Sequence, residues 1–272
     1  MIYRTFQYLC RTSPVLNRTI QKAVYQYLAK LGLEVELPFM NFGYMDSIHG
    51  DDTLPLDPED EPHRSCIQLY HNIVCPVDIE DKRVLEVGCG HGGGASYLTR
   101  YMKPRSFVGI DFSPRAIDFC NQWHEIEGLQ FMHGDAHQLP FEDESFDAVV
   151  NVESSHRYNR MDIFLSEVHR VLRPNGHLLF TDVRIHSEVE ELRDFLNNSN
   201  LKLIEEERIT QKICNALDFD HERKVTLVRE HTPRLLHNSL LDLWAAKGSK
   251  PYKWFKTGKW EYLRYVLCKE ES

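Results

Sequence analysis

The sequence contains no Cys-x-x-Cys pair and no excess of basic residues. Its seven cysteines are scattered along 272 residues, so neither a zinc cluster nor a disulfide framework is predicted, and a reducing, cytoplasmic compartment is favoured. The formal net charge of −9 has the wrong sign for a protein that binds nucleic acid through a basic face. We therefore expect no nucleic-acid partner. The histidines lack the spacing of metal ligands, so we expect no bound metal.

Long apolar runs are also missing. No stretch approaches the roughly 18 apolar residues of a membrane-spanning helix, and the N-terminus has no continuous apolar core of a signal peptide. A soluble or peripheral protein is therefore expected. With 42% apolar residues the chain can bury a full core, and one α/β domain with additions is predicted.

Acidic residues are absent from residues 1–33, which form a basic amphipathic segment that predicts short helices. These helices could pack on their own domain, contact a membrane or lipid, or form an organelle transit peptide. Residues 46–62 reverse the charge and contain prolines, which favours a solvated loop over a metal site. We therefore divide the chain into an N-terminal helical cap with an acidic loop, 1–75, and a main domain, 76–272.

The most informative stretch begins at Val84. An apolar run contains the carboxylate of Glu86 near its end. Five glycines follow within seven residues, namely Gly88, Gly90 and Gly92 to Gly94. Glycine permits positive φ angles and lets a ligand approach the backbone without meeting a Cβ atom. The pattern predicts a strand, a tight ligand-binding turn and a helix.

Short apolar strands alternate with helices along the rest of the main domain. Strands are expected at 106–111, 129–135, 145–152, 177–182, 201–208 and 260–269; helices are expected at 64–74, 114–124, 159–172, 187–197 and through most of 211–257. The helix 159–172 is expected to stop at a turn, 173–176. This alternation predicts a mostly parallel sheet with helices on both faces and ligands at the carboxyl ends of the strands. The insertion at 211–257 is interpreted as a lid.

The glycines at 88, 90 and 93 match a dinucleotide fingerprint, with Asp111 near the position of a ribose-binding acid. Two further acids favour S-adenosylmethionine over a dinucleotide. Glu86 would repel a pyrophosphate but could receive an ammonium, and Asp135 follows a third strand and suits an adenine amino group. Asp111 would accept hydrogen bonds from both ribose hydroxyls.

Five motifs, in order, resemble those of class I S-adenosylmethionine-dependent methyltransferases. They are Glu86-Val-Gly-Cys-Gly, Gly109-Ile-Asp111, Gly134-Asp135-Ala, Ser145-Phe-Asp147 and Val171-Leu-Arg-Pro-Asn-Gly176. Four more stretches resemble the phthiotriol and phenolphthiotriol dimycocerosate methyltransferases, namely Asp60-Glu-Pro-His-Arg64, Leu69-Tyr-His71, the run from Cys89 to Arg100 and Asn151-Val-Glu-Ser-Ser-His156. The resemblance implies a seven-stranded sheet ending in an antiparallel pair, and O-methylation of a secondary alcohol on a polyketide lipid.

Methyl transfer to an alcohol needs a positioned oxygen and a group that removes its proton. His156, shortly after the fourth strand, is the candidate base, and Asp182 at the end of the fifth strand could orient its ring. The alternative is a pocket histidine with satisfied hydrogen bonds and an aspartate that caps a helix. Glu153 could bind the acceptor hydroxyl, support the base, or serve the structure alone.

Four other residues complete the predicted cofactor site. Tyr44 resembles the aromatic residue that closes over the cofactor in related methyltransferases, although it could equally be a core aromatic. Phe112 is placed to stack on the adenine. The backbone around Ala136 would flank the same ring. Asn151, the first residue of the motif that ends at His156, is also predicted to bind the cofactor.

Taken together, these features predict an S-adenosylmethionine-dependent O-methyltransferase acting on a hydroxyl of a lipidic or polyketide-derived acceptor. Aromatic residues of the lid, with the basic helices in 1–33, could wall a tunnel for it, and 1–33 could contact a membrane. One alternative is a C-methyltransferase acting on a sterol or quinone-like lipid. Another is a non-catalytic cofactor-binding scaffold, which would not need the three strand-end carboxylates Glu86, Asp111 and Asp135.

Overall fold

The computed structural model describes residues 38–46 and 54–271. Residues 39–272 form one compact unit. The predicted basic helices in 1–33 lie outside the described residues, as does part of the predicted acidic loop. The predicted domain boundary at residue 75 stays a prediction.

Strands and helices alternate along the described chain, close to the expected bounds. The strands are β1 (Arg83–Val87), β2 (Ser106–Asp111), β3 (Leu129–His133), β4 (Phe146–Val152), β5 (Leu172–Ile185), β6 (Lys202–Arg208) and β7 (Trp260–Cys268). The α-helices are α3 (Arg64–Val74), α4 (Gly93–Met102), α5 (Pro114–Trp123), α6 (Met161–Val171), α7 (Val189–Asn197), α8 (Thr210–Phe219), α9 (His221–His231), α10 (His237–Leu243) and α11 (Lys250–Lys256). Short 3₁₀ helices are η1 (Glu61–His63), η2 (Ser155–Arg157), η3 (His186–Glu188) and η4 (Arg234–Leu236).

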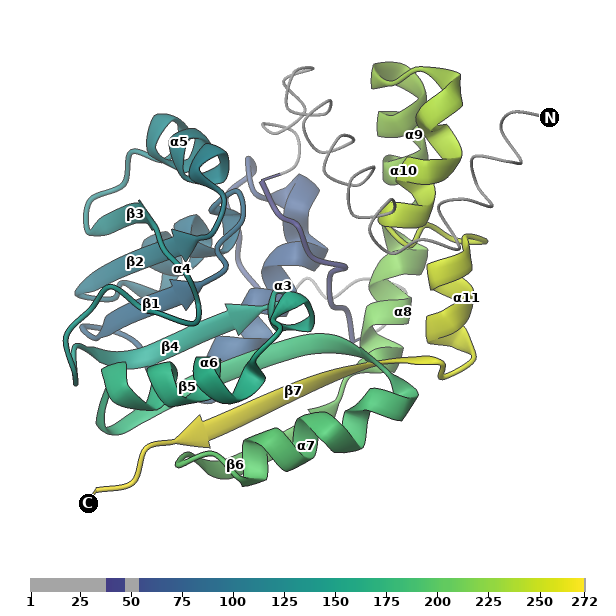
Figure 1. The fold of residues 1–272 in the computed structure, drawn as a ribbon. Helices are drawn as coiled ribbons and strands as arrows, with labels where there is room; N and C mark the ends of the chain where they lie inside the picture. The colour runs from purple at the N-terminus through teal and green to yellow at the C-terminus, as the bar shows by residue number, and fades with distance from the viewer. Residues whose placement is uncertain (1–37, 47–53, 272) are drawn as a thin grey trace. The chain divides into compact units, whose positions relative to one another are not determined.

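The seven strands form one sheet in the order β3-β2-β1-β4-β5-β7-β6 (Figure 1). Strands β1 to β5 are parallel, and β7 runs antiparallel between β5 and β6. The predicted mostly parallel sheet ending in an antiparallel pair is therefore confirmed. The strand order reverses between β1 and β4, which is where open α/β sheets bind their ligands.

Two apolar clusters cover the two faces of the sheet. One contains side chains of α3, α4, α5 and α8, and the other contains those of α6 and α7. The neighbouring residues Val84 and Leu85 of β1 belong to different clusters, because successive side chains of a strand point to opposite faces. Helices on both faces explain why the central strands read as continuous apolar runs.

Strand β5 is longer than predicted, and the expected turn at 173–176 is part of it. Its pairing with β4 shifts register there, and Asn175 has a positive φ of 63°. The irregular stretch is held by Lys269, the residue after β7. The Asn175 amide donates to the Lys269 carbonyl at 2.7 Å, and the Lys269 amide donates to the Gly176 carbonyl at 2.9 Å. At its other end β5 continues to Ile185, so Asp182 lies within the strand and not at its end.

The acidic stretch before α3 is less solvated than expected. Asp60 is buried and accepts hydrogen bonds from Arg100 at 2.7 and 2.8 Å and from the Tyr101 hydroxyl at 2.6 Å. It therefore ties the loop to α4. Within 38–46 and 54–271, no three His, Cys, Asp or Glu side chains are placed to hold a metal ion.

Helices α8 to α11 occupy the predicted insertion between β6 and β7, at the right of Figure 1. Its role as a lid stays a prediction. In the part of the chain that the structure describes, no helix is both long enough and apolar enough to cross a membrane.

Candidate active site

The glycine turn after β1 is fixed to the neighbouring strand β2. The amides of Gly88 and Cys89 donate to the Ile110 carbonyl at 2.8 and 3.0 Å. Gly88 has a φ of 81°, and a Cβ atom there would lie 2.2 Å from Ser154 Oγ. This position therefore requires glycine for both its backbone conformation and its close packing.

Glu86 is fully buried in β1, directly before this turn. Its Oε1 accepts a hydrogen bond from the Tyr70 hydroxyl at 2.7 Å, and no described residue bonds its Oε2. Burial outweighs the Tyr70 hydrogen bond and raises the pKa of Glu86 to about 8. A buried carboxylate with one unsatisfied oxygen suits a cationic group such as the ammonium of S-adenosylmethionine.

Asp111 clamps the glycine turn from the end of β2. Its Oδ2 accepts from the Gly90 amide at 3.0 Å and its Oδ1 from the Ser113 amide at 2.8 Å. A carboxylate has further lone pairs, so these bonds leave capacity for ribose hydroxyls. The adjacent Phe112 is 72% exposed, and its ring centroid lies 6.0 Å from that of His133. The ribose-binding role of Asp111 and the stacking role of Phe112 stay predictions.

Asp135 and Ala136 follow β3. Asp135 Oδ1 accepts from the backbone amide and from ring Nδ1 of His137, both at 2.9 Å. These bonds, the backbone one most, lower the pKa of Asp135. Ala136 is buried against the face that α6 covers. The aspartate is thus ionised and positioned, while its predicted contact with an adenine stays untested.

Asn151 ties β4 to β1 beneath the turn. Its Nδ2 donates to the Val87 carbonyl at 2.8 Å, the Tyr158 hydroxyl at 3.1 Å and Ser154 Oγ at 3.2 Å. Its buried Oδ1 has no partner among the described residues. The amide nitrogen is therefore committed to the protein, and only Oδ1 is left for the predicted cofactor contact.

Tyr44 lies in the segment before α3 and is buried within the core cluster. Its hydroxyl donates to Asp46 at 3.1 Å, and Lys212 Nζ lies 5.7 Å from its ring centroid. Burial and the neighbouring Asp46 raise the pKa of Tyr44 well above its usual value. These contacts give it a place in the core; its predicted closure over the cofactor stays a prediction.

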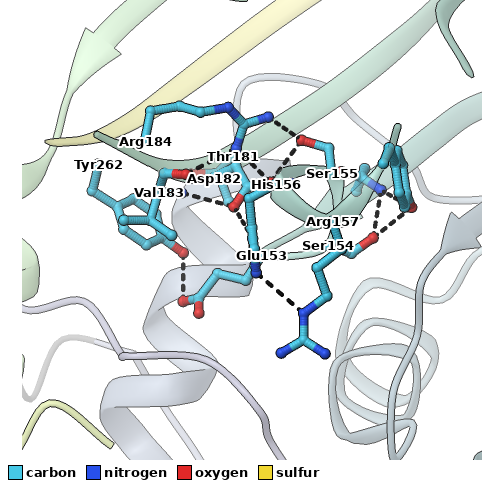
Figure 2. A network of polar contacts seen from close by, with 12 residues as sticks. Glu153, Ser154, Ser155, His156, Arg157, Thr181, Asp182, Val183, Arg184 and Tyr262 are labelled. Atoms are coloured by element: carbon cyan, nitrogen blue, oxygen red, sulfur yellow. Dashed lines mark hydrogen bonds and ion pairs between the residues drawn. The ribbon is translucent and has the colours of Figure 1, made fainter. Parts of the chain in front are cut away.

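Glu153 follows β4 in a left-handed conformation, with a φ of 47°. Its Oε1 accepts from the Tyr262 hydroxyl at 2.6 Å (Figure 2). The same oxygen accepts from the Phe42 amide at 2.8 Å. Desolvation raises the pKa of Glu153 to about 7, against the effect of these two hydrogen bonds. No described residue bonds its Oε2, so this oxygen is left for a ligand.

His156 in η2 and Asp182 in β5 form a close pair (Figure 2). Ring Nδ1 lies 2.7 Å from Asp182 Oδ1, and the His156 amide donates to Asp182 Oδ2 at 2.7 Å. Asp182 is fully buried, whereas the imidazole is 30% exposed. Although burial opposes it, attraction by His156 and Arg184 lowers the pKa of Asp182 well below its usual value.

The partners of the imidazole fix its tautomer. Asp182 accepts at Nδ1, and Arg157 Nε donates to Nε2 at 3.3 Å. A neutral imidazole therefore carries its proton on Nδ1 and has a lone pair on Nε2. The predicted base and the residue predicted to orient it are in hydrogen-bond contact, and the role of His156 as the base stays a prediction.

Several residues around the site had no role in the sequence-based prediction. They are Phe42, Tyr70, Ser155, Arg184 and Tyr262. Arg184 Nη1 lies 3.0 Å from Asp182 Oδ2, and its spacing of two residues along β5 was a readable signal, since such side chains share a face. The Tyr262 contact depends on the pairing of β7 with β5, which no local pattern reveals.

The chain resembles several known methyltransferases. Residues 85–180 match the methyltransferase domain family. The chain is 39% identical over 249 residues to a fatty-acid O-methyltransferase of Mycolicibacterium smegmatis, covering 92% of this chain and 89% of that one. It is 42% identical over 241 residues to a probable phthiotriol/phenolphthiotriol dimycocerosates methyltransferase of Mycobacterium ulcerans, covering 87% and 93%. Its fold resembles the cyclopropane synthase MmaA2 of Mycobacterium tuberculosis, with a TM-score of 0.65, 13% identity and coverage of 85% and 92%.

Proposed function

Because the chain belongs to the S-adenosylmethionine-dependent methyltransferases, we propose that it transfers a methyl group to a hydroxyl oxygen of a lipidic or polyketide-derived acceptor. The 2.7 Å contact between His156 Nδ1 and Asp182 Oδ1 carries this proposal. A secondary alcohol is too weak an acid to ionise unaided, and this pair supplies an oriented base beside the end of β4.

The strand ends around the glycine turn would hold the cofactor. Glu86 Oε2 would receive its ammonium, Asp111 its ribose hydroxyls, and Phe112 and Ala136 its adenine. S-adenosylmethionine supplies an electrophilic methyl group on a sulfonium when it is bound. The unsatisfied buried oxygen of Glu86 supports this assignment, because the cost of burying it is offset when a cation binds.

His156 would take the acceptor proton on Nε2 as the new carbon–oxygen bond forms and the carbon–sulfur bond breaks. Asp182 would accept the hydrogen bond from Nδ1–H throughout. Because its low pKa keeps the Asp182 carboxylate ionised, it would stabilise the resulting imidazolium. Arg157 Nε donates to the same Nε2. The Arg157 side chain must therefore move aside before the acceptor hydroxyl can donate to Nε2. Glu153 Oε2 would orient the acceptor oxygen.

An apolar acceptor fits the surroundings of Glu153. The Phe42 amide bonds its carboxylate, and the Phe42 ring packs edge-on against Phe255 at 5.3 Å. Trp260 contacts Phe255 in turn, at 5.4 Å. The names of the curated relatives also point to long-chain lipid acceptors.

The product distinguishes this function from its alternatives. The full chain is incubated with cofactor labelled with ¹³C in the methyl group, and with a long-chain secondary alcohol, a fatty acid or a sterol. We expect a labelled methyl ether from the alcohol, detected by nuclear magnetic resonance. A labelled carbon–methyl group would show C-methylation, and a methyl ester formed only from the fatty acid would assign the reaction to a carboxylate; either result would overturn the proposal.

A further inference from the structure

Residues 247–260, here called the basic aromatic segment, contrast with the rest of this acidic protein. They contain lysines at 247, 250, 253, 256 and 259 and no acidic residue, although the whole chain has a net charge of −9. All five lysines are exposed. The three at 250, 253 and 256 lie on α11 at spacings that place them on one side of a helix.

Aromatic rings lie among these charges. Lys250 Nζ and Lys259 Nζ lie 4.7 and 5.0 Å from the centroid of the Trp254 ring, and Trp260 contacts the same ring at 4.8 Å. Lys256 Nζ lies 5.5 Å from the Tyr252 ring. Tryptophan and tyrosine with surrounding cations are the side chains that favour the interface between a lipid bilayer and water.

Part of the charge is compensated within the protein. Asp218 on α8 lies 3.1 Å from Lys256 Nζ and 3.7 Å from Lys247 Nζ. The side chains of Lys250, Lys253 and Lys259 pair with no carboxylate of the described residues. Three exposed cations of the segment are therefore available to an anionic partner.

The basic aromatic segment is firmly attached to the wall of the candidate active site. Phe255 is buried and packs against Phe42, whose amide donates to Glu153 at 2.8 Å. At the start of α11, Ser249 Oγ accepts from the Tyr252 amide at 3.2 Å and caps the helix. A surface that binds this segment would consequently lie close to the elements around Glu153.

We propose that the basic aromatic segment binds the surface of an anionic lipid bilayer. Lysines attract the negative headgroups, and the tryptophans enter the interfacial region. A nucleic acid fits less well, because the cations are confined to one short segment, whereas a nucleic-acid backbone is bound along an extended basic groove. This binding goes beyond the methyl-transfer reaction and does not depend on it.

Vesicle flotation of the full chain tests the surface. We expect binding to vesicles of phosphatidylcholine with phosphatidylglycerol, little binding to phosphatidylcholine alone, and weakening as salt is added. The triple variant Lys250→Gln, Lys253→Gln, Lys259→Gln is expected to bind the anionic vesicles roughly 100-fold more weakly. The variant Lys82→Gln, Lys103→Gln, Lys202→Gln makes the same change in net charge at three exposed lysines elsewhere, and it should bind like the wild type.

Calorimetry of cofactor binding is the control that both variants remain folded. Vesicle flotation needs no acceptor, so it tests the surface whichever acceptor the protein methylates. Absence of wild-type binding to anionic vesicles would overturn the proposal. Equal binding by the wild type and the first variant would do the same and would place the contact elsewhere, for example in residues 1–33. Binding to RNA without binding to vesicles would assign the segment to a nucleic acid instead.

Discussion

The Tyr70 hydroxyl donates a hydrogen bond of 2.7 Å to Glu86 Oε1, and both side chains are buried. Tyr70 lies on α3, in the predicted N-terminal cap, whereas Glu86 is the penultimate residue of β1. Its ring also occupies the space beside Gly94, where a Cβ atom would lie 2.0 Å from Tyr70 Cζ. Helix α3 is therefore part of the candidate cofactor site.

Replacing Tyr70 by phenylalanine should weaken cofactor binding without unfolding the protein. The change removes a hydrogen bond to a carboxylate that must be charged when it binds an ammonium, which costs about 1.5–3 kcal/mol, or roughly 10- to 100-fold in Kd. Titration calorimetry with S-adenosylmethionine measures this. An unchanged Kd would show that Glu86 does not hold the cofactor.

The raised pKa of Glu86 predicts a pH-dependent affinity. In the free protein burial keeps this carboxyl largely protonated below about pH 8, whereas binding an ammonium requires it to ionise. Affinity should therefore rise with pH by up to about tenfold per unit below that value, with release of a proton. Calorimetry in buffers of different ionisation enthalpy detects that proton, and Glu86→Gln should bind weakly at every pH. A wild-type affinity that does not change with pH would contradict the assignment.

Gly88→Ala should abolish cofactor binding through a steric clash. Its Cβ atom would lie 2.2 Å from Ser154 Oγ, at a φ of 81°. Gly128→Ala is a matched control, because Gly128 has a φ of 82° and a Cβ atom there comes no closer than 3.8 Å to another residue. Both variants should lose about 1–2 kcal/mol in the free energy of unfolding from backbone strain, and Gly88→Ala should lose more because its Cβ atom also displaces Ser154. Denaturation and calorimetry together separate the two effects, and equal cofactor affinities would refute the steric account.

The fold was largely predictable because its signals are local. The strand 106–111 and the helix 64–74 have the predicted bounds, since buried parallel strands read as short apolar runs and an amphipathic helix repeats its apolar residues. Strand β5 was underestimated because its irregular part, 173–176, is held by hydrogen bonds to Lys269, which lies more than 90 residues away along the chain. A sequence of that stretch alone reads as a turn.

Residues of the candidate site could be predicted only where their position along a strand places them in the site. Glu86 and Asp111 could be identified because Asp111 ends β2 and Glu86 lies one residue before the end of β1, beside the glycine turn. Tyr262 contacts Glu153 across 109 residues, and this contact follows from the antiparallel register of β7. No pattern within either segment contains that information.

Arg184 should prove important for stability as well as for the site. It lies 3.0 Å from the fully buried Asp182, so Arg184→Met leaves a buried carboxylate with less compensation and should cost about 3–5 kcal/mol in the free energy of unfolding. Arg160→Met is the control, because its ion pair with Asp162 is exposed and should not contribute measurably. Urea denaturation of both variants tests this, and similar losses would show that burial of the pair has no special effect.

The most direct test of the account is the rate of methyl transfer in a single turnover by His156→Gln, with cofactor bound at saturation and its Kd measured in parallel. We predict a rate lower by about 10²- to 10⁴-fold with an unchanged Kd, because the variant can still bind the cofactor but cannot accept the acceptor proton. His169→Gln on α6 should react like the wild type. A wild-type rate in His156→Gln would contradict the role of the His156–Asp182 pair as the base.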